Sequence, residues 1–217
     1  MTTLLIDNDV VIKLAQMNAY VDGLAAIDYS PADIGSPSVM LKFMGLFSEE
    51  KRQRLTHNDA EAARLLAALQ SITAIEPTEP EMKTIAALGK LALEHGLDLQ
   101  AGELMLLGIA ISRGGMRVAT GDKRALRALP DLATRWPEVN ALHRQFYCLE
   151  QIVNALADAH DLARVRAAVT TSPRADETIS FAYDKTHSSG KHAFMAFLDM
   201  VIEEHIEKPA PGWLYQP

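Results

Sequence analysis

The feature that most constrains this sequence is the alternation of short apolar runs with longer segments of helical period. The apolar runs lie at residues 4–6, 72–75, 116–120 and 145–149. Apolar side chains between these runs recur at intervals of three and four residues, which is typical of amphipathic helices. Strands that alternate with helices pair in parallel, and helices then cover both faces of the sheet. The sequence therefore predicts an α/β fold, a three-layer α/β/α sandwich with a central parallel sheet.

The last third of the chain has a different pattern. From Glu150 onward it is mostly helical, with one polar interruption at residues 170–174. Its strongest helix, at residues 193–207, carries an apolar stripe at helical spacing. We expect this helical C-terminal extension to pack either on the preceding domain or on a second copy of the chain, as a homodimer.

The composition narrows the class of protein. No apolar run approaches the roughly 18 residues that a membrane-spanning helix needs, and the first residues lack the basic and apolar regions of a signal peptide. We therefore expect no membrane association and a cytoplasmic location. The single cysteine, Cys148, excludes an internal disulfide and any site with several cysteine ligands. A bound metal would then need oxygen or imidazole ligands.

The charge balance is acidic, with 21 Lys and Arg against 28 Asp and Glu and a formal net charge of −7. Such a chain repels nucleic acid at long range, although a local basic patch can still hold a phosphodiester. One candidate patch is formed by Lys123, Arg124 and Arg127, and a second lies at residues 51–54. A solvated helix face is the alternative interpretation of both clusters.

Acidic side chains follow two of the expected strands. Asp7 and Asp9 come directly after the first apolar run, and Asp122 follows the run at residues 116–120. Glu103 stands in the first turns of the helix that leads into that later strand, and Asp98 is a further candidate five residues before it. Each acid could simply cap a helix. Convergent carboxylates repel one another, however, and oxygen-only ligation points to Mg²⁺ or Mn²⁺.

The same residues resemble the motifs of the PIN domain, a fold found in ribonucleases and in the toxins of toxin–antitoxin pairs. Leu5-Ile6-Asp7-Asn8-Asp9 is similar to the family's first strand with its Asp. The segment that begins Glu103-Leu104-Met105 is similar to its acid-led helix, and Val118-Ala119-Thr120-Gly121-Asp122 is similar to its T-x-D strand end. The three motifs occur in the family's order, and the resemblance covers residues 1–150.

This resemblance implies a PIN-like domain over residues 1–150, with residues 151–217 as the extension. It implies a metal-dependent ribonuclease that cleaves single-stranded RNA, with Mg²⁺ or Mn²⁺ as cofactor and an antitoxin-like protein as a further partner. By position, Asp7, Glu103 and Asp122 would be the catalytic acids and metal ligands. Asp9 would be an additional acid, and Thr120 would place a hydroxyl beside the metal.

The chain departs from the family pattern at Lys42. The family usually has a Glu on the second helix, where this sequence has Lys42, unless Glu49 or Glu50 supplies the acid in a shifted alignment. An ammonium group there could replace the metal or bind phosphate. The sequence therefore leaves open a degenerate site, and with it a non-catalytic PIN-like module that binds RNA or a protein.

A second alternative comes from a different class of enzyme. Asp7-Asn8-Asp9-Val10-Val11 also resembles the D-x-D-x-[TV] signature of haloacid-dehalogenase phosphatases, in which the first Asp is the nucleophile and the second is the general acid. The last acidic motif of that superfamily is incomplete, because Lys123, Leu126 and Arg127 stand where its second Asp would be. The phosphatase is therefore the weaker of the two alternatives.

Overall fold

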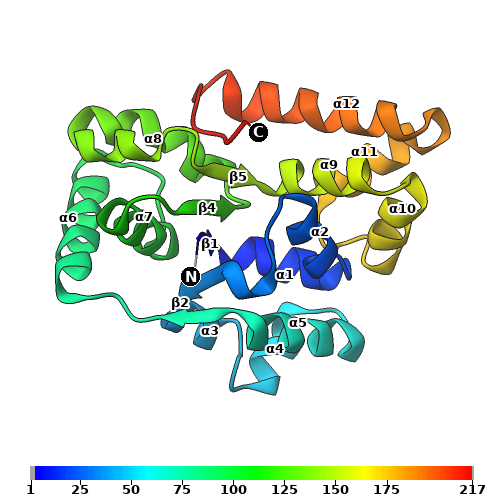
Figure 1. Ribbon diagram of the computed structural model, residues 1–217, viewed down its shortest axis with the longest axis horizontal. Helices are drawn as coiled ribbons and strands as arrows, with labels where there is room; N and C mark the ends of the chain where they lie inside the picture. Colours follow the sequence, from blue (N-terminus) through cyan, green and yellow to red (C-terminus); the bar gives the residue numbers. More distant parts are fainter. Residues whose placement is uncertain (1–2, 217) are drawn as a thin grey trace.

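We describe residues 3–216 of the chain in a computed structural model (Figure 1). In this part of the chain, five strands form one sheet in which every pair is parallel, with the order β3-β2-β1-β4-β5. The strands are β1 (Leu4–Ile6), β2 (Ile34–Pro37), β3 (Thr73–Ile75), β4 (Arg117–Thr120) and β5 (Phe146–Cys148). The predicted α/β class with a parallel sheet is confirmed. From β1 the chain builds outward to β3 and then crosses to the other side of β1 to form β4 and β5.

The strands send alternate side chains into two separate hydrophobic cores. Leu4 and Ile6 belong to the first core and Leu5 belongs to the second. On the neighbouring strand, Val118 and Ala119 divide between the two cores in the same way. Because side chains alternate across a strand, this division places a core on each face of the sheet.

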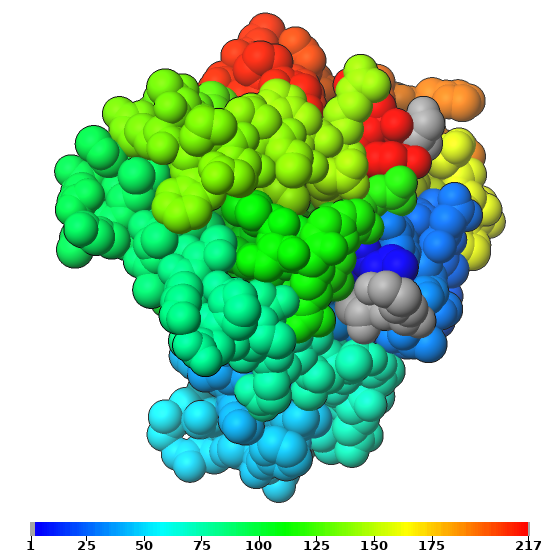
Figure 2. All heavy atoms as spheres, turned by 60° about the vertical axis from the view of Figure 1, so that its left-hand side comes forward, coloured from blue at the N-terminus to red at the C-terminus, as the bar shows by residue number. Residues whose placement is uncertain are grey.

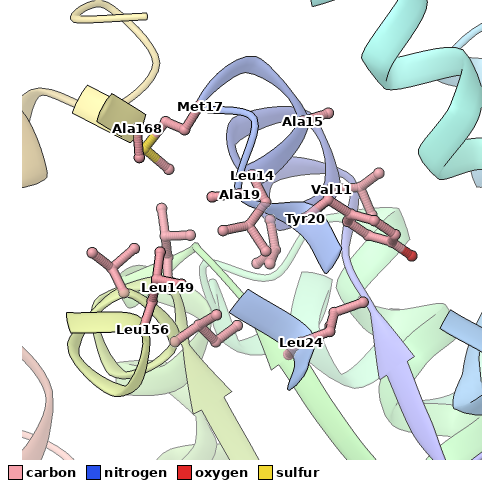
Figure 3. Packing of buried hydrophobic residues seen from close by; sticks show 14 of the residues in the cluster. Val11, Leu14, Ala15, Met17, Ala19, Tyr20, Leu24, Leu149, Leu156 and Ala168 are labelled. Atoms are coloured by element: carbon pink, nitrogen blue, oxygen red, sulfur yellow. The ribbon is translucent and has the colours of Figure 1, made fainter. Parts of the chain in front are cut away.

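The first core is built mainly by helices from both ends of the chain. These helices are α1 (Asn8–Gln16), α2 (Tyr20–Ala26), α5 (Asp59–Ser71), α9 (Leu149–Ala159), α10 (Leu162–Thr171), α11 (Glu177–Thr186) and α12 (Lys191–Ile202). Figure 3 shows Leu14 and Leu24, from α1 and α2, facing Leu149 and Leu156 of α9. The N-terminal and C-terminal parts of the chain therefore share one core.

The second core lies under α6 (Glu79–His95), α7 (Ala101–Arg113) and α8 (Lys123–Arg135). Helices α6 and α7 approach closely at Gly108, where an added Cβ would lie 2.4 Å from Ile85 Cγ1. Helix α8 continues through Pro130. Burial of Leu132 and Ala133 after the proline offsets the lost backbone hydrogen bond.

Strand β2 is not among the strands expected from the apolar runs of the sequence, and its residues are Ile34-Gly35-Ser36-Pro37. Gly, Ser and Pro are poor strand formers. In the structure, Gly35 and Ser36 pair with β3, and Gly35 also pairs with β1. The strand is buried along its whole length between two neighbours, so tertiary pairing overrides the local preference. Two short helices follow it, α3 (Ser38–Phe43) and α4 (Glu49–Leu55).

The C-terminal helices cover apolar surface within the chain. Phe194 and Leu198 of α12 are fully buried in the first core. A π-helical turn at Glu203–Glu207 follows, and Ile206 and Trp213 are buried in the second core. The tail then runs beside β5, where Tyr215 N donates to Phe146 O at 2.7 Å. The predicted apolar stripe is therefore covered intramolecularly. No helix among residues 3–216 has the length and apolar character to span a bilayer.

We expect Trp213→Ala to lower the free energy of unfolding by about 3–5 kcal/mol, because it removes a buried aromatic side chain from the second core. Trp213 is 2% exposed and packs against the His143 ring at 4.0 Å between centroids. Urea unfolding followed by circular dichroism measures the change. Leu93→Ala is the control, since Leu93 is 85% exposed and should change stability little. Equal effects of the two substitutions would contradict a tail that is part of the core.

Candidate functional site

A groove of about 770 Å³ opens at the carboxyl ends of β1 and β4. Four carboxylates line it, those of Asp7, Asp9, Glu103 and Asp122. The strand order reverses between β1 and β4, and in open α/β sheets ligands bind at such a reversal, outside the carboxyl ends of the strands. The structure thus brings four of the five acids that the sequence singled out, all except Asp98, into one groove at the expected edge of the sheet.

Asp7 is held between the first helix and the adjacent strand. Its backbone N donates to Ala119 O at 2.9 Å, and its Oδ1 accepts from Asn8 N at 2.7 Å. Its Oδ2 lies 3.4 Å from the Thr120 hydroxyl, which donates to it and in turn accepts from Asp122 N at 3.1 Å. Burial, together with the charges of Asp9 and Asp122, raises the pKa of Asp7 to about 6, although these hydrogen bonds oppose the shift.

Glu103 reaches the groove from the N-terminal turn of α7. Its carboxylate accepts a hydrogen bond from Gln100 N and so caps the helix. The carboxyl group is nevertheless almost fully buried, and this burial, with the charges of Asp122 and Asp7, raises its pKa to about 7. The turn packs closely against α3, because a Cβ added at Gly102 would lie 3.3 Å from Met40 Cε, with Asp7 Oδ1 in ordinary contact at 4.0 Å.

Asp122 is neutralised by a neighbour on its own helix. Both of its carboxylate oxygens accept from the Arg124 guanidinium, at 3.1 Å from Nε and 2.6 Å from Nη2. Asp122 also caps α8, since Arg124 N donates to it at 2.8 Å. Burial opposes ionisation of Asp122, but the hydrogen bonds and the charge of Arg124 lower its pKa below the usual value.

Asp9 is also paired with a cation. Its Oδ2 lies 2.8 Å from Lys13 Nζ, one turn later on α1, and Lys13 lies 3.0 Å from Asp176 at the start of α11. Asp9 packs tightly on the strand end, where a Cβ at Gly121 would lie 2.0 Å from its Oδ2. A side chain at position 121 would therefore displace the Asp9 carboxylate from its place beside the strand end.

The donor chemistry of the groove fits a hard divalent cation, since every candidate ligand is a carboxylate oxygen. The spacing of these carboxylates does not fit such an ion, because Asp9 is paired with Lys13 and Asp122 is paired with Arg124. Across residues 3–216, no group of three or more acidic, histidine or cysteine side chains is close enough to hold a metal ion. Holding one would require Asp122 to exchange the Arg124 guanidinium for the metal.

Lys42 is not where the sequence interpretation placed it. Its side chain is exposed on α3, and it is not among the residues that line the groove. The face of α3 that meets the groove instead presents Val39, Met40 and Phe43. The ammonium group of Lys42 therefore does not neutralise the carboxylates of the groove. Lys13 and Arg124 pair with two of them instead.

The remaining candidates lie around the groove. Asp98 is largely exposed and lies 3.8 Å from Arg124 Nε. Lys123 forms an ion pair with the buried carboxylate of Glu150, which takes it out of the expected basic patch. Arg127 is exposed and donates to the Lys123 carbonyl at 3.2 Å. The predicted patch thus contributes two exposed guanidinium groups, those of Arg124 and Arg127.

Sequence reasoning missed Lys13 and Asp176 as parts of this site. Lys13 stands four residues after Asp9 on a predicted helix, so the i, i+4 rule for helical ion pairs could have found it. Asp176 lies far away in sequence, and its approach to Lys13 depends on how α11 packs against α1.

We compared the chain with protein-family models, with curated proteins and with solved structures, and none of the three comparisons gave a match. The functional proposal therefore rests on the fold and on the groove.

Ionisation of Asp7 should cost stability in the folded chain. Its pKa is raised from 3.8 to about 6, so the folded state binds the proton more tightly than the unfolded state does. The free energy of unfolding therefore falls as the pH rises from about 4 to about 6. Asp7→Asn keeps the cap and removes the charge. We expect it to raise the free energy of unfolding by about 1–3 kcal/mol above pH ~7 without metal, and to have little effect near pH ~4.

Urea unfolding in chelator across this pH range measures the effect. Asp59→Asn is the matched control, since Asp59 is an exposed residue in the first turn of α5. A stabilisation by Asp7→Asn that does not change with pH would contradict the expected cause.

Proposed function

We propose that this chain is a PIN-like ribonuclease that cleaves single-stranded RNA with the help of Mg²⁺ or Mn²⁺. The observation that supports the proposal is the convergence of Asp7, Asp9, Glu103 and Asp122 in one groove at the strand-order reversal. Asp7 and Glu103 are 8% and 7% exposed. Burying several carboxylates together is unfavourable unless a cation offsets their repulsion, and phosphodiester hydrolysis is a common use of such sites.

Asp7, Glu103 and Asp122 would hold the metal. The bound ion would supply an activated water and neutralise charge on the phosphodiester. The other residues of the groove would position these acids. Thr120 orients Asp7 through its hydroxyl, and the Asn8 and Gln100 amides fix the carboxylates of Asp7 and Glu103. Arg124, once released from Asp122, would face the groove as a bidentate donor to phosphate.

One observation favours a second candidate, a PIN-like module that binds RNA or a protein without catalysis. Arg124 and Lys13 already balance two of the four carboxylates, so the groove is partly neutralised by the chain itself. In that case the acids would serve to anchor the two cations and the ends of α1, α7 and α8. The two candidates differ in whether the groove binds Mn²⁺.

We expect Asp7→Asn and Asp122→Asn each to abolish Mn²⁺-dependent cleavage of a fluorescent single-stranded RNA. Asn can replace Asp as a helix cap, so both variants should fold, while each loses a charged metal ligand. Cleavage is measured by gel electrophoresis with and without chelator. Asp131→Asn, an exposed position on α8, is the control and should cleave like the parent.

Three outcomes separate the classes of protein. Chelator-sensitive cleavage that survives Asp7→Asn would refute the proposed site. Turnover of an aryl phosphate in place of RNA would support the haloacid-dehalogenase-like phosphatase. No hydrolysis of either substrate, together with RNA binding, would support the non-catalytic module.

Arg124→Gln should tighten Mn²⁺ binding about tenfold or more, because it removes the cation that competes for Asp122. Titration calorimetry measures the affinity directly and does not depend on activity. Arg127→Gln is the control, since it removes the same charge one turn further along α8.

Lys42→Glu supplies a further comparison at the position where the PIN pattern expects an acid. Because Lys42 lies outside the groove, we expect its replacement to leave Mn²⁺ affinity close to that of the parent. Tighter binding in Lys42→Glu than in Arg124→Gln would show that α3 moves to bring position 42 to the metal.

A further inference from the structure

Three large apolar side chains are exposed together at the corner formed by α3, α4 and the turn between them. Val39, Phe43 and Phe47 are 52%, 62% and 79% exposed. Val39 and Phe43 also line the acidic groove. Phenylalanine side chains this exposed are costly in water, at about 1.5–3 kcal/mol for each that could be buried, and a cluster of them beside a groove marks a contact surface.

Packing and a hydrogen bond fix the position of this corner. On the side of α3 away from the groove, Leu41 and Met44 are buried in the first core. The chain turns at Gly45, whose φ of 91° favours glycine and whose carbonyl accepts from the Arg52 guanidinium of α4. The exposed rings are therefore presented by a packed and hydrogen-bonded corner.

The charge of this corner is opposite to that of the whole chain. Residues 39–54 carry four cations, Lys42, Lys51, Arg52 and Arg54, against two acids, Glu49 and Glu50. Arg54 is paired with Glu50, and Lys42 and Lys51 are exposed. The chain as a whole has a net charge of −7. Figure 2 shows this corner, in light blue, projecting at the lower end of the molecule.

We propose that the corner of residues 39–54 binds single-stranded RNA, with bases stacked on Phe43 and Phe47 and the backbone held by Lys42 and Lys51. Aromatic side chains next to lysines are the usual means of binding single strands, because every base has a face that can stack. The carboxylates of the groove repel phosphates, so the strand needs an anchor outside it. The corner supplies that anchor at the groove's edge. The inference rests on the proposed function and assigns its substrate-binding surface.

The test is the binding of a short fluorescent oligouridylate, measured by anisotropy in chelator and at low salt. We expect Phe43→Ala and Phe47→Ala each to raise Kd by about 5- to 150-fold, the range for loss of one stacked base. Phe43→Trp should retain binding. Lys42→Glu should weaken binding and reduce its salt dependence. An oligomer with abasic sites should bind the parent weakly and should not distinguish the Phe variants.

Phe181→Ala is the matched control, since Phe181 is 52% exposed on α11 and does not line the groove. It should bind RNA like the parent. No RNA binding by the parent overturns the inference, and so does unchanged binding in Phe43→Ala and Phe47→Ala. A dimeric parent that these substitutions make monomeric, with RNA binding unaffected, overturns it in favour of a protein-contact surface.

The same measurement distinguishes this inference from the proposed function. Because binding is measured in chelator, it does not depend on metal or on cleavage. RNA binding that depends on Phe43 without Mn²⁺-dependent cleavage would refute the nuclease and leave the binding surface in place. Cleavage that depends on Asp7 and not on Phe43 or Phe47 would support the nuclease and overturn the proposed binding surface.

Discussion

The pairing of β1 with β4 is the constraint on which the site depends. The two strands are adjacent in the sheet although more than a hundred residues separate them, and they form the point where the strand order reverses. The hydrogen bond from Asp7 N to Ala119 O continues this pairing to the end of the strands. Thr120 then links the side chain of Asp7 to the backbone of Asp122. A slip in this register would separate the two acids, so sheet pairing and site geometry are fixed together.

The electrostatics of the groove is a balance between buried acids and two local cations. Desolvation and mutual repulsion raise the pKa values of Asp7 and Glu103, whereas Arg124 lowers that of Asp122. Helix N-termini offset part of the cost, because α1, α7 and α8 each present an end to one carboxylate. Capping and ligand binding are therefore compatible roles for the same side chains. Caps fix where the carboxylates lie, and Arg124 and Lys13 hold two of them.

The C-terminal helices are more closely tied to the site than the sequence indicated. Helices α9 to α12 bury side chains in the core that α1 and α2 also use, and Asp176 at the start of α11 reaches Lys13 beside the groove. Trp213 and Ile206 enter the second core on the opposite face of the sheet. The chain thus closes around both faces of its sheet with its own last residues. That closure supports the position of α1, whose N-terminus carries Asp7 and Asp9.

The sequence by itself determined the alternation of strands and helices, the acids at the ends of β1 and β4, and the acid-led α7. These features are local, because apolar periodicity and capping residues act over a few neighbours. It missed β2, whose Gly, Ser and Pro residues adopt a strand only because two neighbouring strands bury them. It also placed Lys42 beside the acids, whereas the rotation of α3 turns that side chain to solvent and Phe43 toward the groove. The ion pairs Asp9–Lys13 and Asp122–Arg124 are local in the chain. The meeting of all four carboxylates in one groove was decided by tertiary structure alone, since it depends on packing between segments that are remote in the chain.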